Sequence, residues 1–176
     1  MSVKNKVLFI TGAASGIGFE IARQFAKEGA KLVITDLNAG KITQAVSALK
    51  SEDADVMGVE CDVTSEEQIT AAIDKTIRTY GRIDVLVNNA GLSQGLDPIQ
   101  KGSYDDWETM IDTNIKGLLY VTKVVSNWMI GNGYGHIVNL GSIAGKEVYA
   151  NGNVYCASKH AVDALNKGMR IDLLPY

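Results

Sequence analysis

The sequence predicts an α/β protein with a doubly wound, parallel sheet of the Rossmann type, in three α/β/α layers. Three observations predict this fold. Short apolar segments of strand length alternate with longer segments of helical period. The short segments are apolar at nearly every position, which is typical of strands covered on both faces. A glycine-rich turn joins the first short segment to the first long one.

Five strands and five helices are expected, in strict alternation. The strands are expected at residues 7–11, 31–35, 56–60, 83–88 and 136–140, and the helices at 17–28, 40–52, 65–80, 107–130 and 153–174. Strict alternation implies parallel strands and right-handed crossovers. We therefore expect a single dinucleotide-binding domain over residues 1–176, with strand order 3-2-1-4-5.

Local signals mark several helix ends and one helix face. Gly29 and Gly81 follow two of the helices, where a left-handed C-cap is expected. Thr64 or Ser65 precedes two glutamates and is expected as an N-cap. In the helix at 107–130 one face is marked by Ile111, Ile115, Leu118, Thr122, Val125 and Met129.

Composition narrows the class of protein. The 176 residues are 46% hydrophobic and 21% charged, with a net charge of −3. This balance argues against nucleic-acid and membrane-surface partners. No apolar run has the length of a membrane span, and residues 1–6 lack the apolar stretch of a secretion signal. The two cysteines, Cys61 and Cys156, form no disulfide framework, so a cytoplasmic location is expected.

The turn at residues 11–18 is the main functional signal. Gly12 permits a tight turn, Gly16 lets a phosphate approach the backbone, and Gly18 allows close packing of helix and strand. Ser15 and Ile17 then lie where the helix N-terminus would meet a pyrophosphate. A glycine turn that binds nothing is the alternative. The strand before it and the helix after it favour a nucleotide site.

Asp36 follows the second strand, eighteen positions after Gly18. An acidic residue at this place accepts hydrogen bonds from both adenosine ribose hydroxyls and repels a 2′-phosphate. The alternative is an ordinary turn aspartate. Leu37 and Asn38 supply no cation for a phosphate, and the glycine turn contains none. NAD is therefore the expected cofactor, with NADP as the other choice.

Two further strand ends face the same crevice. Asp62 and Val63 close the third strand, and the fourth is closed by Asn88, Asn89, Ala90 and Gly91. In an open α/β sheet, ligands bind beyond the carboxyl ends of the strands. Asparagine and glycine are also common turn residues, which is the alternative reading of these positions.

Tyr155 and Lys159 lie four residues apart at the start of the last helix, so they share one face. Ser142 lies just past the fifth strand, at the same edge. A nearby ammonium favours the phenolate of a tyrosine, so this trio suits acid–base chemistry on a carbonyl–alcohol pair. The alternative is a surface Tyr–Lys pair with a capping serine. The chain's histidines, His136 and His160, have no metal-like partner array, and no metal is expected.

Together these residues resemble the short-chain dehydrogenase/reductase family, from Lys6 to Tyr176. Thr11, Gly12, Gly16 and Gly18 match its glycine motif, Asp62 its adenine-ring aspartate, and the residues from Asn88 to Gly91 its Asn-Asn-Ala-Gly motif. The family's four catalytic residues fall on Asn114, Ser142, Tyr155 and Lys159. The resemblance implies a cofactor site that includes Tyr155 and Lys159 beside the crevice residues already named.

The resemblance also implies a mechanism. Tyr155 exchanges the hydroxyl proton, and Ser142 hydrogen-bonds the substrate oxygen. Lys159 holds the nicotinamide ribose and lowers the tyrosine pKa, while Asn114 positions a water that relays protons from Lys159. Hydride passes between the substrate carbon and the nicotinamide, and the protein supplies orientation and electrostatics.

The two halves of the chain resemble different subfamilies. Up to Gly91, residues 12–20 and 36–38 are similar to NAD-dependent 3-hydroxybutyrate dehydrogenases. From Leu92 on, residues 95–98, 106–114 and 152–155 are similar to the 3-hydroxy acid (serine) dehydrogenases, which mostly use NADP. A natural subfamily and a recombinant joined near residues 88–91 both explain this pattern.

Family members usually run to about 250 residues. Relative to them the chain lacks strands 6 and 7, the Pro-Gly turn that contacts nicotinamide, and the substrate lid. The strand at 136–140 would then lie at an open edge, which favours aggregation. We expect a marginally stable chain, or a homodimer or homotetramer formed through the helices at 107–130 and 153–174.

The expected activity is hydride transfer between NAD(P) and a secondary alcohol or its carbonyl, the substrate being a small 3-hydroxy acid. Candidate substrate contacts lie between Ser142 and Tyr155, namely Lys146, Glu147, Tyr149, Asn151 and Asn153. Lys146 is the nearest cation for a substrate carboxylate, although a solvated Lys–Glu pair is the alternative. Two other functions stay open: a 3-oxoacyl carrier-protein reductase, and a dinucleotide-binding fragment without turnover.

Overall fold

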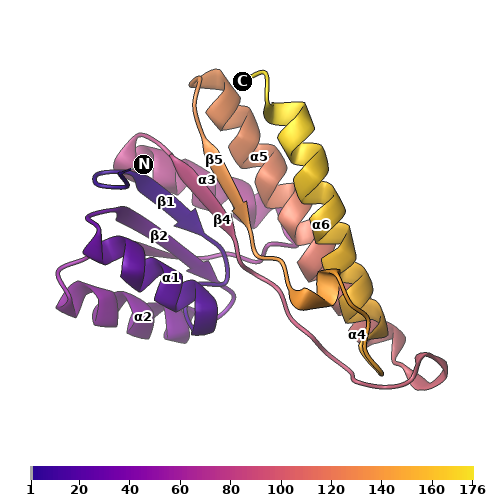
Figure 1. Ribbon diagram of the computed structural model, residues 1–176. Coiled ribbons are helices and arrows are strands. Elements are labelled where there is room, and N and C mark those ends of the chain that lie inside the picture. Colours follow the sequence, from indigo (N-terminus) through magenta and orange to yellow (C-terminus); the bar gives the residue numbers. More distant parts are fainter. Residues whose placement is uncertain (1) are drawn as a thin grey trace.

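A five-stranded parallel sheet organises the molecule, in the order β3-β2-β1-β4-β5 (Figure 1). The computed structural model describes residues 2–176. The strands are β1 Val7–Ile10, β2 Lys31–Asp36, β3 Asp55–Glu60, β4 Val85–Asn88 and β5 His136–Asn139. The predicted fold class and strand order are confirmed, and the predicted strand ends differ by one or two residues.

Helices cover the sheet from two sides. They are α1 Gly16–Lys27, α2 Ala39–Ser51, α3 Glu66–Tyr80, α4 Tyr104–Ile111, α5 Leu118–Gly131 and α6 Asn153–Leu173. One core cluster joins α1 and α2 to β1 and β2. The other joins α3 and α5 to the opposite face of the sheet. The three-layer arrangement follows from these two cores, because α1, α2, α3 and α5 each bury one apolar face against the strands.

The predicted helix caps are found. The Ser65 side chain accepts a hydrogen bond from the Gln68 amide at 3.3 Å, so Ser65 rather than Thr64 caps α3. Gly81 ends the same helix at φ 74°, and Gly29 lies just past α1 at φ 77°. Both glycines take the left-handed conformation that side chains disfavour.

The helix predicted at 107–130 is the main departure. It begins earlier, at Tyr104, and a π-helical segment at Asp112–Gly117 separates α4 from α5. A π turn holds more residues than an α turn, so it rotates the faces on either side. Ile111, expected on the buried face, is 38% exposed, whereas Met110 and Asn114 are buried. Leu118, Thr122, Val125 and Met129 are buried as expected.

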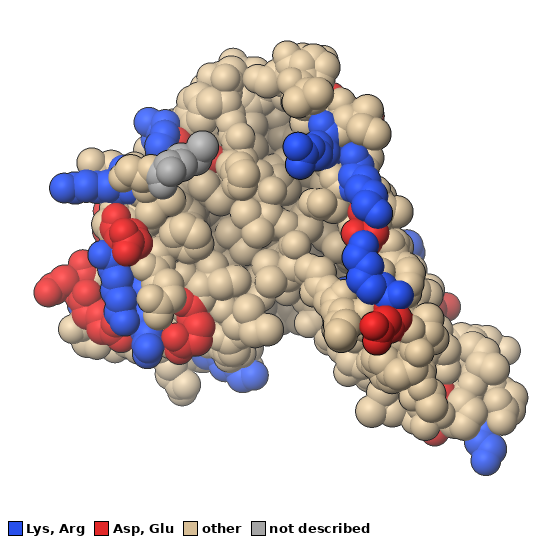
Figure 2. Space-filling model, viewed as in Figure 1, with Lys and Arg blue, Asp and Glu red and all other residues tan. Residues whose placement is uncertain are grey.

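β5 lies at the edge of the sheet, as predicted. It pairs with β4 alone, in the register Val87 to Val138. Val138 is 37% exposed, while every residue of β1 and β4 is buried. Figure 2 shows a surface free of charged side chains between α1 and α6, with charges gathered at its margins.

In the part of the chain that the structure describes, each helix falls short of the length and apolarity that crossing a membrane requires.

Candidate functional site

The glycine turn between β1 and α1 has three distinct steric requirements. Gly12 lies at φ 61°, and a Cβ there would come within 2.9 Å of the Ala90 Cα. Gly16 lies at φ 58° with open space where a Cβ would be. A Cβ on Gly18 would meet the Asn89 amide and lie 2.7 Å from the Gly12 carbonyl oxygen. The predicted roles of a tight turn, an open approach and close packing match these surroundings.

The N-terminus of α1 is open to a ligand. Ser15 is its N-cap, and its side chain makes no capping hydrogen bond within the described residues. Ser15, Gly16 and Ile17 are exposed. The first backbone N–H groups of a helix lack partners inside the helix and favour a negative charge. The residues present therefore fit a pyrophosphate at this point.

Asn89 holds the glycine turn in place. Its side-chain amide donates to the carbonyl oxygens of Thr11, at 2.9 Å, and Gly12, at 2.8 Å. The buried Thr11 hydroxyl accepts from the backbone amides of Asn89 and Ala90, at 3.1 and 3.0 Å. Asn89 was predicted as a cofactor contact. In the structure its side-chain nitrogen is used by the turn that it braces, and the contact with a cofactor stays a prediction.

Asp36 faces the glycine turn from the end of β2. One of its carboxylate oxygens accepts from the Ala14 amide at 3.3 Å, and the other from the Asn38 amide at 3.3 Å. Leu37 beside it is 65% exposed. Each carboxylate oxygen keeps further acceptor capacity, so Asp36 is able to accept from ribose hydroxyls.

Asp62 and Val63 lie at the end of β3 but face different ways. The Asp62 carboxylate accepts from the backbone amide and hydroxyl of Thr64, at 2.8 and 2.7 Å, and remains partly exposed. Val63 is 7% exposed and its side chain packs in the core, where a Cβ on Gly117 would come within 2.6 Å of it. Asp62 is thus free to meet a ligand through its side chain, and Val63 only through its backbone.

Asn114 sits in the π-helical segment, fully buried, and its amide is completely used. It donates to the Leu92 carbonyl at 2.8 Å and to the Ser158 hydroxyl at 3.0 Å, and it accepts from the Leu92 amide at 2.8 Å. Ser158 in turn donates to the Tyr155 carbonyl at 2.7 Å. The Asn114 side chain therefore joins the segment after β4 to α6, and a relay water would have to be held by other atoms of this residue.

Tyr155 and Lys159 lie together on α6. The Lys159 ammonium is 6.0 Å from the centroid of the Tyr155 ring and donates to the Leu140 carbonyl at 3.0 Å. Lys159 is only 9% exposed, and this burial lowers its pKa because it disfavours the charged form.

Ser142 lies on the short 3-10 turn at Ile143–Gly145 that follows β5. Its side-chain oxygen accepts from the Ala144 amide at 3.1 Å, which leaves the hydroxyl proton available to a substrate oxygen. Gly145 brings this turn against α6, since a Cβ there would be 2.6 Å from the Lys159 carbonyl oxygen. Ser142 is thus set relative to α6 by a backbone contact.

Gly91 connects the cofactor turn to the catalytic groups. A Cβ at this position would lie 3.2 Å from the Asn114 side-chain oxygen and 3.6 Å from the Lys159 ammonium. The structure therefore brings Gly91, Asn114 and Lys159 together at the carboxyl end of β4. Tyr155 lies beside Lys159 on α6, and the turn that follows Ser142 meets the Lys159 backbone at Gly145.

The predicted substrate contacts separate into two groups. Lys146, the expected carboxylate partner, pairs instead with Asp163 at 2.9 Å, two helical turns beyond Tyr155. Asp163 also pairs with Lys167 at 2.7 Å, and Figure 2 shows charges of both signs along this side of the molecule. Glu147, Tyr149 and Asn151 are exposed. Asn153 is partly buried and contacts the segment after β4.

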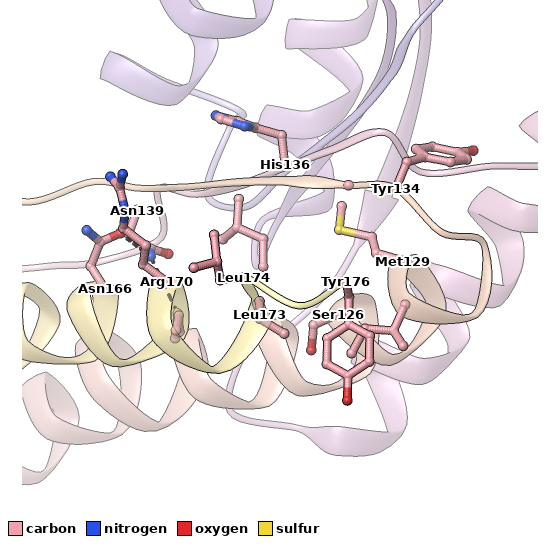
Figure 3. Close-up of a pocket in the computed structure, with 14 residues that line it drawn as sticks. Ser126, Met129, Tyr134, His136, Asn139, Asn166, Arg170, Leu173, Leu174 and Tyr176 are labelled. Atoms are coloured by element: carbon pink, nitrogen blue, oxygen red, sulfur yellow. Dashed lines mark hydrogen bonds between the residues drawn. The ribbon is translucent and has the colours of Figure 1, made fainter.

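A cavity of about 530 Å³ lies elsewhere, between β5 and the C-terminal ends of α5 and α6 (Figure 3). Its lining includes Met129, His136, Met169, Leu173 and Tyr176. Leu173 is eighteen residues from Tyr155, about 27 Å along a helix. The cavity is therefore separate from the catalytic groups. Within residues 2–176 no three His, Cys, Asp or Glu side chains form a metal-binding group.

Comparison with known proteins identifies the family. The sequence model of the short chain dehydrogenase family matches residues 6–176 of this chain. The chain belongs to the short-chain dehydrogenase family. The NADP-dependent 3-hydroxy acid dehydrogenase of Salmonella typhi is 43% identical over 168 residues, which are 95% of this chain and 66% of that protein. The corresponding enzyme of Escherichia coli strain K12 is 40% identical over the same shares.

Solved structures agree. An NAD+-bound xylitol dehydrogenase superposes with a TM-score of 0.97 at 35% identity, covering all of this chain and 68% of that one. The serine dehydrogenase of Escherichia coli gives 0.89 at 38% identity, covering 94% of this chain and 76% of that one. The chain spans about two thirds of the length of the relatives that it matches.

Sequence reasoning missed two residues of this site. Ser158 was overlooked because a serine inside a helix carries no spacing signal of its own. Its position four residues after Val154 on a helix face, between Tyr155 and Lys159, becomes informative only once Asn114 is known to lie opposite. Gly145 was overlooked because its contact, the Lys159 carbonyl, is fourteen positions away in the sequence.

Proposed function

We propose that this short-chain dehydrogenase family member is an NAD(P)-dependent oxidoreductase that interconverts a secondary alcohol and its carbonyl. The observation that carries the proposal is the buried Lys159 ammonium beside Tyr155, at the same sheet edge as the open glycine turn. A buried cation next to a phenol is costly to maintain without a use for it, and proton exchange with an alcohol is such a use.

The residues present fit a dinucleotide. The open Gly16 position and the N-terminus of α1 suit its pyrophosphate, and Asp36 suits the adenosine ribose. Asp62 lies where an adenine ring would meet a polar group, and Gly91 leaves room beside Lys159. When bound, the nicotinamide supplies the hydride acceptor or donor.

The chain's own groups move and hold the proton. The Tyr155 phenol gives its proton to a carbonyl oxygen, and in the reverse direction its phenolate oxygen takes the proton of the alcohol, with the Lys159 ammonium 6.0 Å from the ring centroid. The Ser142 hydroxyl, whose oxygen already accepts from Ala144, donates to the substrate oxygen. Asn114 fixes the spacing between Leu92 and α6, which orients Tyr155.

NAD is the proposed preference. The Asp36 carboxylate would repel the 2′-phosphate of NADP, and neither Leu37 nor Asn38 provides a cation to hold it. The 3-hydroxy acid dehydrogenases similar to this chain are NADP-dependent, whereas the similar xylitol dehydrogenase is bound to NAD+. Asp36→Ala should shift the ratio of kcat/KM values for NADP and NAD toward NADP, by about tenfold or more.

A small 3-hydroxy acid is the proposed substrate. The support is the similarity of the chain to an NADP-dependent 3-hydroxy acid dehydrogenase, at 43% identity over 95% of this chain, and to a serine dehydrogenase, at 38% identity over 94% of it. Because Lys146 is paired with Asp163, a substrate carboxylate would have to displace that partner or find another donor.

Pairing through α4–α5 and α6 is the proposed mode of assembly, as a homodimer or homotetramer. Ile111 and Leu119 are each 38% exposed on this side. Sedimentation equilibrium would show a monomer if this assembly is wrong. The free, buried Cys61 and Cys156 support a cytoplasmic location, where thiols stay reduced.

The test is the formation of NADH and NADPH over a panel containing 3-hydroxybutyrate, 3-hydroxypropionate, L-serine and 2-propanol. We expect turnover of at least one acid, faster with NAD, and a loss of about 10² to 10⁴ in kcat for Tyr155→Phe. Equal turnover by Tyr155→Phe would contradict the assigned chemistry. Dinucleotide binding without turnover of any alcohol would favour the binding-fragment reading.

A further inference from the structure

The segment after β4 is tied down at both ends beside the catalytic helix. At its start, the Leu92 amide and carbonyl both bond to the Asn114 side chain, each at 2.8 Å. At its far end, the Asp97 carbonyl accepts from the Asn153 side-chain amide at 3.0 Å. Between these points residues 93–97 are exposed and have no regular secondary structure.

These two ties place the segment along the first turns of α6. Just before the segment, a Cβ placed on Gly91 would lie 3.6 Å from the Lys159 ammonium nitrogen. Asp97, near its end, reaches Asn153. Asn153 and Lys159 are six residues apart, about 9 Å along the helix, and Tyr155 lies between them. The segment from Leu92 to Asp97 therefore runs past Tyr155.

A third contact fixes the middle of the segment on α4. The Gln94 side-chain amide donates to Asp106 at 2.7 Å, and Gly95 takes φ 63° beside the same carboxylate. A Cβ on Gly95 would come within 2.5 Å of an Asp106 oxygen, so the segment has no room to move toward α4. Its remaining freedom is away from α4, and the bond to Asn153 opposes that movement.

We propose that Asn153 is a positioning residue that holds the segment Leu92–Asp97 as one wall of the substrate site beside Tyr155. The proposal rests on the proposed function. Asn153 suits the task because its two amide atoms act separately: the oxygen accepts from the Val154 amide at 2.8 Å, while the nitrogen donates to Asp97. The wall and the first turn of α6 thus share one side chain.

The consequence is a selective effect on substrate binding. Releasing Asp97 would loosen the wall that faces the alcohol, while the glycine turn keeps its own contacts with Asn89 and Ala90. The loss in substrate affinity should be that of one net hydrogen bond, so the substrate KM should rise about three- to tenfold. The KM for the dinucleotide should stay within about twofold.

The deciding variant is Asn153→Asp. It keeps the shape and the acceptor for Val154, and a carboxylate at a helix N-terminus is favourable, so α6 is retained. The donor to Asp97 is lost, and the side chain gains a negative charge. The matched control is Asn132→Asp, which removes a similar bond, from the Asn132 amide to the Trp128 carbonyl at 2.8 Å, at the far end of α5.

Two readouts on the full chain decide the proposal. Steady-state kinetics with the best substrate of the panel should give a raised substrate KM in Asn153→Asp and an unchanged one in Asn132→Asp. Hydrogen exchange of the Leu92 amide, which bonds to the Asn114 side chain, should be faster without any ligand in Asn153→Asp only. Unchanged exchange, or an equal rise in the KM of the dinucleotide, would overturn the proposal.

The exchange measurement needs no turnover. Absence of turnover in the unsubstituted protein would therefore signal failure of the proposed function. Unchanged exchange in Asn153→Asp would signal failure of the positioning role itself.

Discussion

The two sides of the site are positioned by different kinds of contact. Around the glycine turn, close approaches dominate: Gly12 and Gly18 are required because a Cβ has no room, and the Asn89 amide braces the turn. Around α6, buried polar side chains set the distances, through Asn114, Ser158 and Lys159. The first arrangement tolerates no added atom, whereas the second tolerates shape changes but no lost hydrogen-bond partner. Substitutions of the two kinds should therefore fail in different ways.

Gly18→Val should have the largest effect. Its Cβ would collide with the Gly12 carbonyl and the Ala13 Cα, which are backbone atoms that cannot yield without opening the turn. We expect a loss of about 3 kcal/mol in the free energy of unfolding and no measurable dinucleotide binding. Urea denaturation measures the free energy of unfolding, and a fluorescence titration with NADH measures dinucleotide binding.

The matched control is Gly168→Ala on α6. Gly168 lies inside a helix with open space around a Cβ, so alanine should be neutral or stabilising by about 0.5–1 kcal/mol. Equal damage from both substitutions would show that the glycine turn has no special steric demand.

Gly145→Ala applies the steric test of the glycine turn to the α6 side of the site, because it adds a methyl group next to α6. The new methyl group would lie 2.6 Å from the Lys159 carbonyl oxygen and push the turn that carries Ser142 away from α6. We expect kcat to fall by about 10² through misplacement of Ser142. The dissociation constant of the dinucleotide should stay unchanged. A loss of both kcat and dinucleotide affinity would mean that the glycine turn and the α6 side of the site are not positioned independently.

The difference between the two sides also explains what the sequence could predict. The glycine spacing, the apolar strands and Asp36 are local patterns, and their places in the structure match the prediction. The π-helical segment could not be anticipated, because the apolar spacing of residues 107–130 is read with the period of an α-helix, which the extra residue of a π turn breaks. Ile111 was misplaced for this reason. The pairing of Lys146 with Asp163 could not be anticipated, because the two residues are seventeen positions apart.

Ser158→Ala tests the buried hydrogen bonds around α6 directly. Its effect on stability and activity should be intermediate. It leaves the Asn114 amide with one partner fewer and frees the Tyr155 carbonyl. An unsatisfied buried donor costs about 1–3 kcal/mol, which should appear in urea denaturation. Because Tyr155 is oriented through this bond, kcat should fall by about tenfold with little change in the dinucleotide KM.

Ser158→Thr serves as its control, since it keeps the hydroxyl. It should recover most of the lost kcat even if the extra methyl group lowers stability. A Thr variant as slow as the Ala variant, at equal stability, would argue that packing and not the hydrogen bond positions Tyr155.

The smallest expected effect is a pH dependence of stability arising from Lys159. Burial lowers the pKa of Lys159 below the 10.5 of an exposed lysine. As pH rises from that lowered pKa toward 10.5, the folded protein releases this proton before the unfolded chain does, so the unfolded chain binds more protons. The free energy of unfolding should therefore rise with pH over that interval.

Lys159→Met lacks this group and isolates its contribution. Urea denaturation from pH 7 to pH 10.5, with both proteins in a Tyr155→Phe background to remove the neighbouring phenol, gives the difference between them. The free energy of unfolding of the Lys159 protein should increase relative to that of the Lys159→Met protein as the pH rises. A difference that is flat or moves the other way would mean that the ammonium is stabilised at the site, and that burial is not what dominates its ionisation.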